Sequence, residues 1–356
     1  MKRFLLILLT ALWVASCEIP FPLEQKGEPR LYLQCIPQDT VVALTVQYAA
    51  PVGADAPKNF RPSDISLLVN GEKLAVSDRK ETHDFFTARI DLEEGDEVSV
   101  SVSGEGLHDA SGHTEVPAAP RILDFTWEDA KVDTIDATAV HIRLDHAPAE
   151  NEYFGIQIVN YCEITYLDGS KNTLVSYLTP GYVLTLADSM GFDLEDFMQV
   201  NYYDFHLGGN QQWQPITLVT RKQFTEDTYN FYLNSFDASI LDTIRERMPD
   251  GETGMAGGGI VSGEVGPVPG GGKLTPDQIP VKMVNNYFFY FARLSPEFYQ
   301  YAKTLYQSNF DFLSNMGLTP ANFSWTNVEG GMGMVGALSG VQLGPLTKEV
   351  VPKLKQ

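Results

Sequence analysis

The sequence predicts a mainly β protein: an N-terminal immunoglobulin-like β-sandwich over 30–118, then a larger β-rich domain over 121–345 with a helical insertion. Three observations lead to this fold class. Apolar residues alternate with polar ones along many short segments, which is the period of a half-buried strand. Turn signals separate the early segments every 8–12 residues, as in a sandwich. The 356 residues exceed what one hydrophobic core usually organises, so we expect two domains.

The N-terminus has the features of a signal peptide over 1–16. Lys2 and Arg3 form a positive start, and an apolar run of 11 residues, FLLILLTALWV, follows. This run is too short to span a bilayer, which requires about 20 residues. The alternatives are an ordinary secretory signal followed by an incidental cysteine, and a transmembrane anchor.

The segment VASC at 14–17 resembles the lipobox of bacterial lipoproteins. This resemblance implies cleavage before Cys17 and acylation of its thiol and new amine, including a palmitate. Two or more acyl chains anchor a protein stably. Glu18 stands where Asp would resemble an inner-membrane retention signal, so we expect an outer-membrane location, with the periplasmic or cell-surface face left open. Residues 17–29 contain three prolines and read as a lipid-anchored tether.

The first domain follows strand periodicity from Arg30 onward. Val98, Val100 and Val102 alternate with serines, and Asn70-Gly71 is a favoured two-residue hairpin turn because both residues tolerate positive φ. The proline-containing stretch 116–120 marks the end of this domain.

The second domain combines further strands with helical segments. Strand-like runs occupy 121–127, 153–162, 229–233 and 283–294, and the sequence predicts a helix over 295–313. Ser295 is a good N-cap and Pro296 suits the first helical position. Weaker helical patterns cover 188–198 and 237–248. Residues 251–272 contain ten glycines and are interpreted as a long surface loop.

Cysteine placement argues against a disulfide bond in the mature chain. Cys35 shares a strand face with Leu31 and Leu33, and Cys162 shares one with Ile156 and Ile158. We therefore expect two buried, inert thiols in different domains. Cysteine pairs with zinc-site spacing are absent from the sequence.

Composition and motifs point away from several function classes. The 25 Lys and Arg against 46 Asp and Glu give a net charge of −21, and −23 once 1–16 are removed, which argues against nucleic acid and anionic lipid surfaces. The glycine run ending at Lys273 lacks the Ser or Thr of a phosphate-binding loop, and neither GxSxG nor HExxH occurs. Acidic residues over 91–97 flank a turn and are interpreted as a solvated cluster. We expect no enzymatic activity, no cofactor and no metal.

Motifs spread over most of the mature chain resemble a Bacteroidetes outer-membrane lipoprotein family, the domain of unknown function 4249 family. Besides Cys17, they are VNG at 69–71, EGDEV at 94–98, TEVP at 114–117, LSPEFYQY at 294–301 and WTNVEGGMGMVGA at 325–337. The resemblance implies a role beside TonB-dependent transporters and supplies no catalytic residues. The glycine-rich insertion departs from the family pattern.

The expected function is that of a non-catalytic, lipid-anchored accessory to a TonB-dependent nutrient transporter, with an unknown ligand. The alternative is a surface glycan-binding or adhesion module of pilus type, and an enzyme of unknown class is third. Tyr and Phe crowd the second domain, and an exposed aromatic face there would suit partner docking or sugar stacking. An unpaired edge groove would favour strand exchange.

Overall fold

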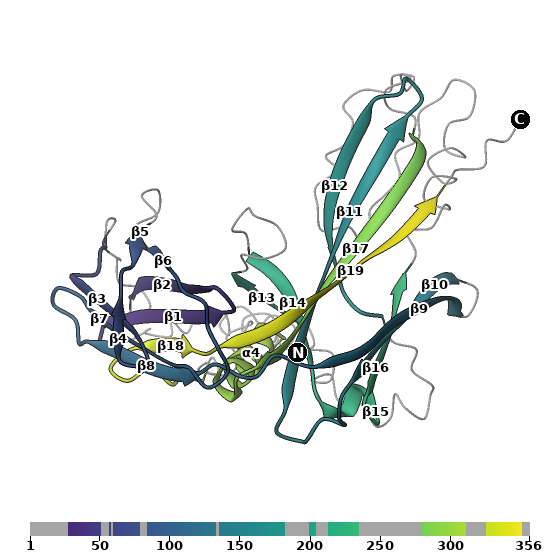
Figure 1. Ribbon diagram of the computed structural model, residues 1–356. Coiled ribbons are helices and arrows are strands. Elements are labelled where there is room, and N and C mark those ends of the chain that lie inside the picture. The colour runs from purple at the N-terminus through teal and green to yellow at the C-terminus, as the bar shows by residue number, and fades with distance from the viewer. Residues whose placement is uncertain are drawn as a thin grey trace, which may run out of the picture.

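The computed structural model describes residues 28–50, 57, 60–78, 84–132, 135–181, 199–203, 213–234, 280–310 and 325–350. Within these ranges the protein is mainly β, as the alternating pattern predicts, and its strands form two lobes (Figure 1). An eleven-stranded sheet runs through both lobes, and each lobe adds a four-stranded sheet of its own.

The N-terminal lobe consists of two sheets that share one apolar core. One sheet contains β1 (Arg30–Gln38), β2 (Val41–Ala49), β5 (Ser77–Asp78) and β6 (Phe85–Arg89); the other contains β3 (Asp64–Val69), β4 (Glu72–Leu74), β7 (Glu97–Ser103) and β8 (Ala110–Glu115). The predicted strand phases are confirmed, because Val98, Val100 and Val102 are buried while the serines between them are partly exposed. The Asn70-Gly71 turn is also confirmed, with φ angles of 51° and 80°.

The second lobe places a small sheet against the large one. The small sheet contains β9 (Ile122–Val132), β10 (Ile135–Leu144), β15 (Phe224–Thr225) and β16 (Thr228–Asn234), and a short 3-10 helix, η2 (Arg221–Gln223), precedes β15. The large sheet here contains β11 (Tyr153–Tyr166), β12 (Lys171–Leu178), β13 (Gln199–Tyr203), β14 (Trp213–Val219), β17 (Pro280–Leu294) and β19 (Leu338–Val350). Phe154, Phe231, Phe289 and Phe291 fill the core between the two sheets.

Helix α4 (Pro296–Phe310) confirms the predicted helix over the residues that the structure describes. The Ser295 hydroxyl accepts a hydrogen bond from the backbone N–H of Phe298, as an N-cap does, and another from Ala337. Phe298 and Tyr299 enter an apolar cluster that also contains Ile36 and Phe85. This cluster draws on both lobes, so helix packing joins them.

The last described segment returns to the N-terminal lobe. Strand β18 (Met332–Val335) pairs in parallel with β1, and Glu329 bridges to Ser111 of β8. This segment lies within the expected second domain, 121–345, and in the structure its strand β18 adjoins β1 of the N-terminal lobe. The segment fits closely, because a Cβ atom on Gly333 would lie 2.0 Å from the carbonyl oxygen of Leu33.

Several sequence predictions concern parts of the chain outside the described residues. They are the signal peptide 1–16, Cys17 and most of the tether, the weaker helices 188–198 and 237–248, and the glycine-rich segment 251–272. Within the described residues, none of the helices is both long and apolar enough to cross a membrane.

Candidate functional site: an edge groove and a projecting blade

A groove opens at one edge of the N-terminal lobe, between the two facing sheets. Strands β3 and β4 supply one side, and β5 and β6 supply the other. Its volume is about 480 Å³, within the range of small-molecule pockets. Both edge strands are short, three residues in β4 and two in β5, so the apolar core reaches the surface there.

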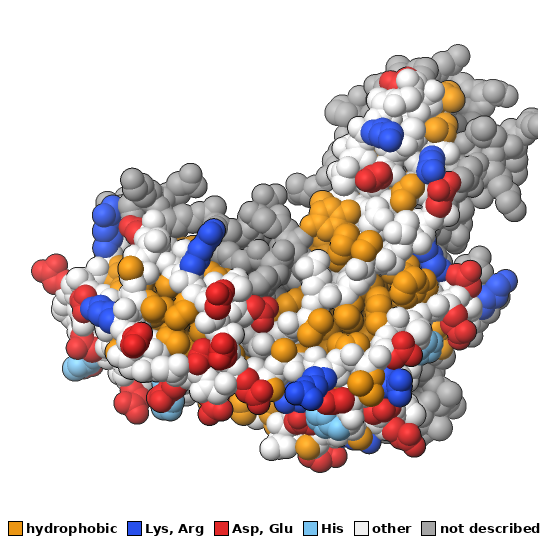
Figure 2. Space-filling view, in the orientation of Figure 1, with side chains coloured by type: hydrophobic (Ala, Val, Ile, Leu, Met, Phe, Trp, Pro, Cys, Tyr) orange, Lys and Arg blue, Asp and Glu red, His pale blue; other side chains and the backbone are white. Residues whose placement is uncertain are grey.

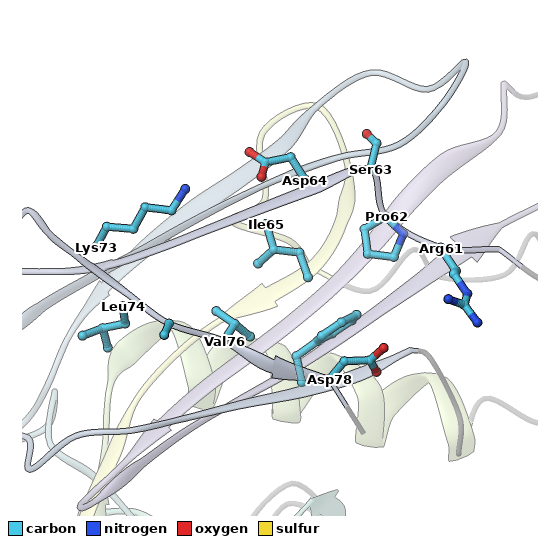
Figure 3. A pocket seen from close by; sticks show the side chains of 11 residues that line it. Arg61, Pro62, Ser63, Asp64, Ile65, Lys73, Leu74, Val76 and Asp78 are labelled. Atoms are coloured by element: carbon cyan, nitrogen blue, oxygen red, sulfur yellow. The ribbon is translucent and has the colours of Figure 1, made fainter. Parts of the chain in front are cut away.

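The groove combines an apolar floor with a charged rim. Ile65, Leu74 and Val76 form the floor and are half-buried against the lobe's core. Figure 3 shows Lys73 at one end of the groove and Arg61 with Asp78 at the other. Such a lining can take up an apolar group that carries polar or charged ends. Sequence reasoning missed this groove, since the sequence gives no indication that β4 and β5 lie at the same edge.

The second candidate is a blade made by the outer parts of β11, β12, β17 and β19, which extends away from the rest of the molecule (Figure 1). Figure 2 shows hydrophobic side chains gathered over the lower part of this blade. Among the described residues, five large hydrophobic side chains are exposed: Leu167, Leu174, Val175, Leu123 and Trp127. The first three belong to the β11–β12 hairpin, so this hairpin concentrates exposed apolar surface.

An ion cluster stands at the entry to β11. His146 Nδ1 lies 2.6 Å from Asp145 Oδ1 and its Nε2 lies 3.3 Å from Glu152, which also pairs with Arg293 of β17 at 2.9 Å. The hydrogen bond with Asp145 raises the pKa of His146, while partial burial opposes this rise. The same hydrogen bond lowers the pKa of Asp145. Each member has a partner in the cluster, and we interpret the group as a clamp that holds loop 145–152 against β17.

The two remaining cysteines behave as the strand phases predict. Cys35 and Cys162 are both free and buried, in separate apolar clusters. Burial raises the pKa of the Cys35 thiol to about 12 and also raises that of Cys162. Because only a thiolate is an effective nucleophile, neither residue is suited to covalent catalysis.

One residue of the acidic cluster over 91–97, Asp96, has a structural role. The Asp96 carboxylate accepts hydrogen bonds from the Asn70 side chain at 2.7 Å and from the backbone N–H of Glu93 at 2.8 Å. It therefore fastens two turns of the lobe to each other. Across the described parts of the chain, groups of three or more His, Cys, Asp and Glu residues that could hold a metal ion are absent.

The aromatic residues of the run 287–291 lie mostly in the hydrophobic core and not on the surface. Tyr287, Phe289, Tyr290 and Phe291 are buried, while Phe288 is only partly buried and meets Tyr161 edge to face, with ring centroids 5.6 Å apart. An extended aromatic platform of the kind that binds sugars would need more exposed rings than the described part of β17 offers.

The described residues therefore form a mainly β protein of two lobes, with an edge groove on one lobe and a projecting blade on the other. A family model described as a domain of unknown function (DUF4249) matches residues 17–342, and the chain belongs to this family. The match begins at Cys17 and runs through the N-terminal lobe, helix α4 and the returning segment. A search of curated proteins gives no match.

Two solved structures show remote likeness. One is a DUF4785 family protein from Legionella pneumophila, at 11% identity and a TM-score of 0.22, covering 59% of this chain and 57% of that one. This chain thus spans little more than half of that protein. The other is the complex of Dpr2 Ig1-Ig2 with DIP-Theta Ig1-Ig3, at 10% identity and a TM-score of 0.20, covering 58% of this chain and 98% of that one.

Proposed function

We propose that this protein is a non-catalytic, lipid-anchored outer-membrane protein that accompanies a TonB-dependent nutrient transporter. The observation that carries the proposal is the exposed apolar surface of the β11–β12 hairpin, where Leu167, Leu174 and Val175 are each about half exposed, at 55%, 48% and 49%. The lipobox around Cys17 and the family resemblance support the membrane location and the transporter as the partner.

Physical chemistry favours a protein partner for this hairpin. Leu174 and Val175 are successive residues of β12 and expose apolar surface on both faces of the hairpin, and neighbouring exposed apolar side chains mark interaction sites more often than scattered ones do. The hairpin lies on a blade that extends from the body of the molecule (Figure 1). The net charge of −23 on the mature chain makes direct adsorption to anionic lipid unfavourable, which leaves a protein as the better partner.

We also propose that the N-terminal lobe is an immunoglobulin-like sandwich. The strand order supports it, with β5-β6-β2-β1 facing β4-β3-β7-β8. With β4 as the additional strand beside strand C, the strands β1, β2, β6 and β5 take the places of A, B, E and D, and β3, β7 and β8 take those of C, F and G. Many cell-surface domains share this sandwich architecture, which suits an accessory role at the outer membrane.

The proposal is tested by native purification of the tagged protein from outer membranes. We expect a TonB-dependent transporter to be recovered with the wild type, and to be lost with the double variant Leu174→Lys/Val175→Lys. Leu123→Lys is the matched control, because Leu123 is exposed to 57% but lies on β9. Equal transporter recovery from the hairpin variant would overturn the docking role.

A ligand-binding module is the second candidate function, and the edge groove favours it. Val76→Asp would place a charge on the apolar floor and reduce binding of any ligand with an apolar body. The measurement is a thermal-shift screen of small amphiphiles and oligosaccharides against the wild type and Val76→Asp. A screen without hits, or hits that bind both proteins equally, would count against the groove as a binding site.

A further inference from the structure

Within the described part of the chain, strand β12 lies at an edge of the large sheet. Among the described strands it pairs with β11, and its first five residues, 171–175, are exposed. Natural proteins usually shield such edges with charges, prolines or bulges, because a row of unpaired backbone groups can recruit another strand. Here the exposed stretch KNTLV carries one charge and neither proline nor glycine.

The hydrogen bonds show which backbone groups point outward. In an antiparallel ladder, the N–H and C=O groups of one residue point the same way, and successive residues alternate. The N–H of Tyr166 donates to the carbonyl oxygen of Ser170 at 2.9 Å, so Ser170 faces β11. By alternation, Lys171, Thr173 and Val175 turn their backbone groups away from β11.

The side chain of Asn172 covers part of this outward row. Its Oδ1 accepts a hydrogen bond from the backbone N–H of Thr173 at 2.9 Å. The side-chain oxygen of Asn172 therefore accepts the hydrogen bond that a carbonyl oxygen of an adjoining strand would otherwise accept. The register pairs Leu174 with Cys162 and Val175 with Tyr161, so the two exposed apolar side chains lie on opposite faces of the sheet.

We propose that the outer edge of β12 binds an extended segment of a partner protein as an added strand, and that this segment is neutral or basic with apolar residues on both faces. This inference rests on the proposed docking function of the hairpin. Leu174 and Val175 would each contact a side chain of the added strand, one on each face, while Thr173 would exchange its Asn172 contact for a backbone hydrogen bond. The charge of −23 on the mature chain favours such a segment over a second acidic copy of the chain.

The experiment is hydrogen exchange on the purified full-length protein with a synthetic peptide, acetyl-Lys-Thr-Val-Leu-Thr-Val-Lys-amide. We expect exchange of the β12 amides to slow at least tenfold when the peptide is added. The same peptide with Glu at both ends should bind at least tenfold more weakly at low salt.

Substitutions at two neighbouring positions test the backbone mechanism. Thr173→Pro removes an outward N–H without touching the ladder to β11, so it should abolish protection, whereas Thr173→Val should retain it. Asn172→Ala uncovers the Thr173 N–H and should tighten peptide binding, which keeps the test decisive if Thr173→Pro fails to fold. Leu123→Lys should leave peptide binding unchanged.

Three results would overturn the inference. They are unchanged exchange of the β12 amides with peptide, equal peptide binding by Thr173→Pro and the wild type, and concentration-dependent protection of β12 without peptide, which would identify a second copy as the occupant. Because this experiment needs no transporter, its failure overturns strand addition alone. Loss of docking is judged separately, by transporter recovery with the Leu174→Lys/Val175→Lys variant.

Discussion

The Tyr290 hydroxyl donates a hydrogen bond of 2.7 Å to the carboxylate of Asp39, and this contact joins the two lobes. Asp39 lies in the β1–β2 turn of the N-terminal lobe with a φ of 43°, and its other oxygen accepts the backbone N–H of Gly340 in β19 at 3.1 Å. Tyr290 belongs to β17 and is buried. The tip of one lobe is thus fastened to two strands of the other.

We predict that Tyr290→Phe lowers the free energy of unfolding by about 1.5–3 kcal/mol, because a partly buried hydrogen bond to a charged acceptor is lost. Urea unfolding measures this change. A double-mutant cycle with Asp39→Asn should show that the two substitutions are not additive. Additive effects would mean that the two side chains contribute independently.

Strand β18, which pairs with β1, allows a steric prediction. Gly333→Ala should destabilise the protein by more than about 3 kcal/mol, because the backbone φ of 111° is strained for alanine and the added methyl group would meet the Leu33 carbonyl. Gly169→Ala is the matched control, since its φ is 84° but nothing lies within 4 Å of the added atom. This control should cost about 1–2 kcal/mol, the cost of the left-handed conformation alone. Similar losses for both variants would show that β18 is not tightly inserted.

The His146 cluster predicts a pH dependence. Its contacts with Asp145 and Glu152 raise the pKa of His146 above the ordinary 6.5, so the stabilisation is fully present below pH 6.5 and is lost as the pH rises through the folded-state pKa. The wild type should therefore exceed His146→Gln in stability at pH 5.5 and lose that advantage by pH 8.5. The carboxylates stay ionised throughout this interval, because the pKa values of Asp145 and Glu152 are both lowered. Urea midpoints of both proteins at the two pH values are the measurement, and a difference that does not vary with pH would contradict the clamp.

The two described thiols should resist alkylation in the native protein. Burial excludes the reagent, and a raised pKa keeps both Cys35 and Cys162 protonated at neutral pH. Mass spectrometry after treatment with iodoacetamide should show modification of both only in denaturant. Rapid native labelling of Cys35 would indicate frequent opening of the N-terminal core.

The lipobox gives a prediction about anchoring. Cys17→Ala should remove fatty-acid labelling and release the protein from the outer-membrane fraction, because the acyl chains are the expected anchor. Metabolic labelling with a palmitate analogue and membrane fractionation test this. Cys35→Ala serves as the control and should label like the wild type. Equal labelling of the Cys17→Ala protein would mean that the cysteine is incidental.

Local signals in the sequence determined the strands and the helix. Val98, Val100 and Val102 face the core because strand side chains alternate, and Ser295 begins α4 because its side chain can cap the first turn. The free cysteines follow from the same phase argument. Each of these features depends on residues that are close together in the chain, and a single sequence displays such relationships directly.

Tertiary structure alone decided how distant segments meet. Asp39 and Tyr290 are 251 positions apart, and β18 joins β1 across most of the chain, so local periodicity contains no sign of either contact. The edge groove exists because β4 and β5 are short edge strands of the two facing sheets and lie on the same side of the lobe. Apolar residues in a strand usually indicate a core position. Leu174 and Val175 are nevertheless exposed, because β12 lies at the edge of the described sheet.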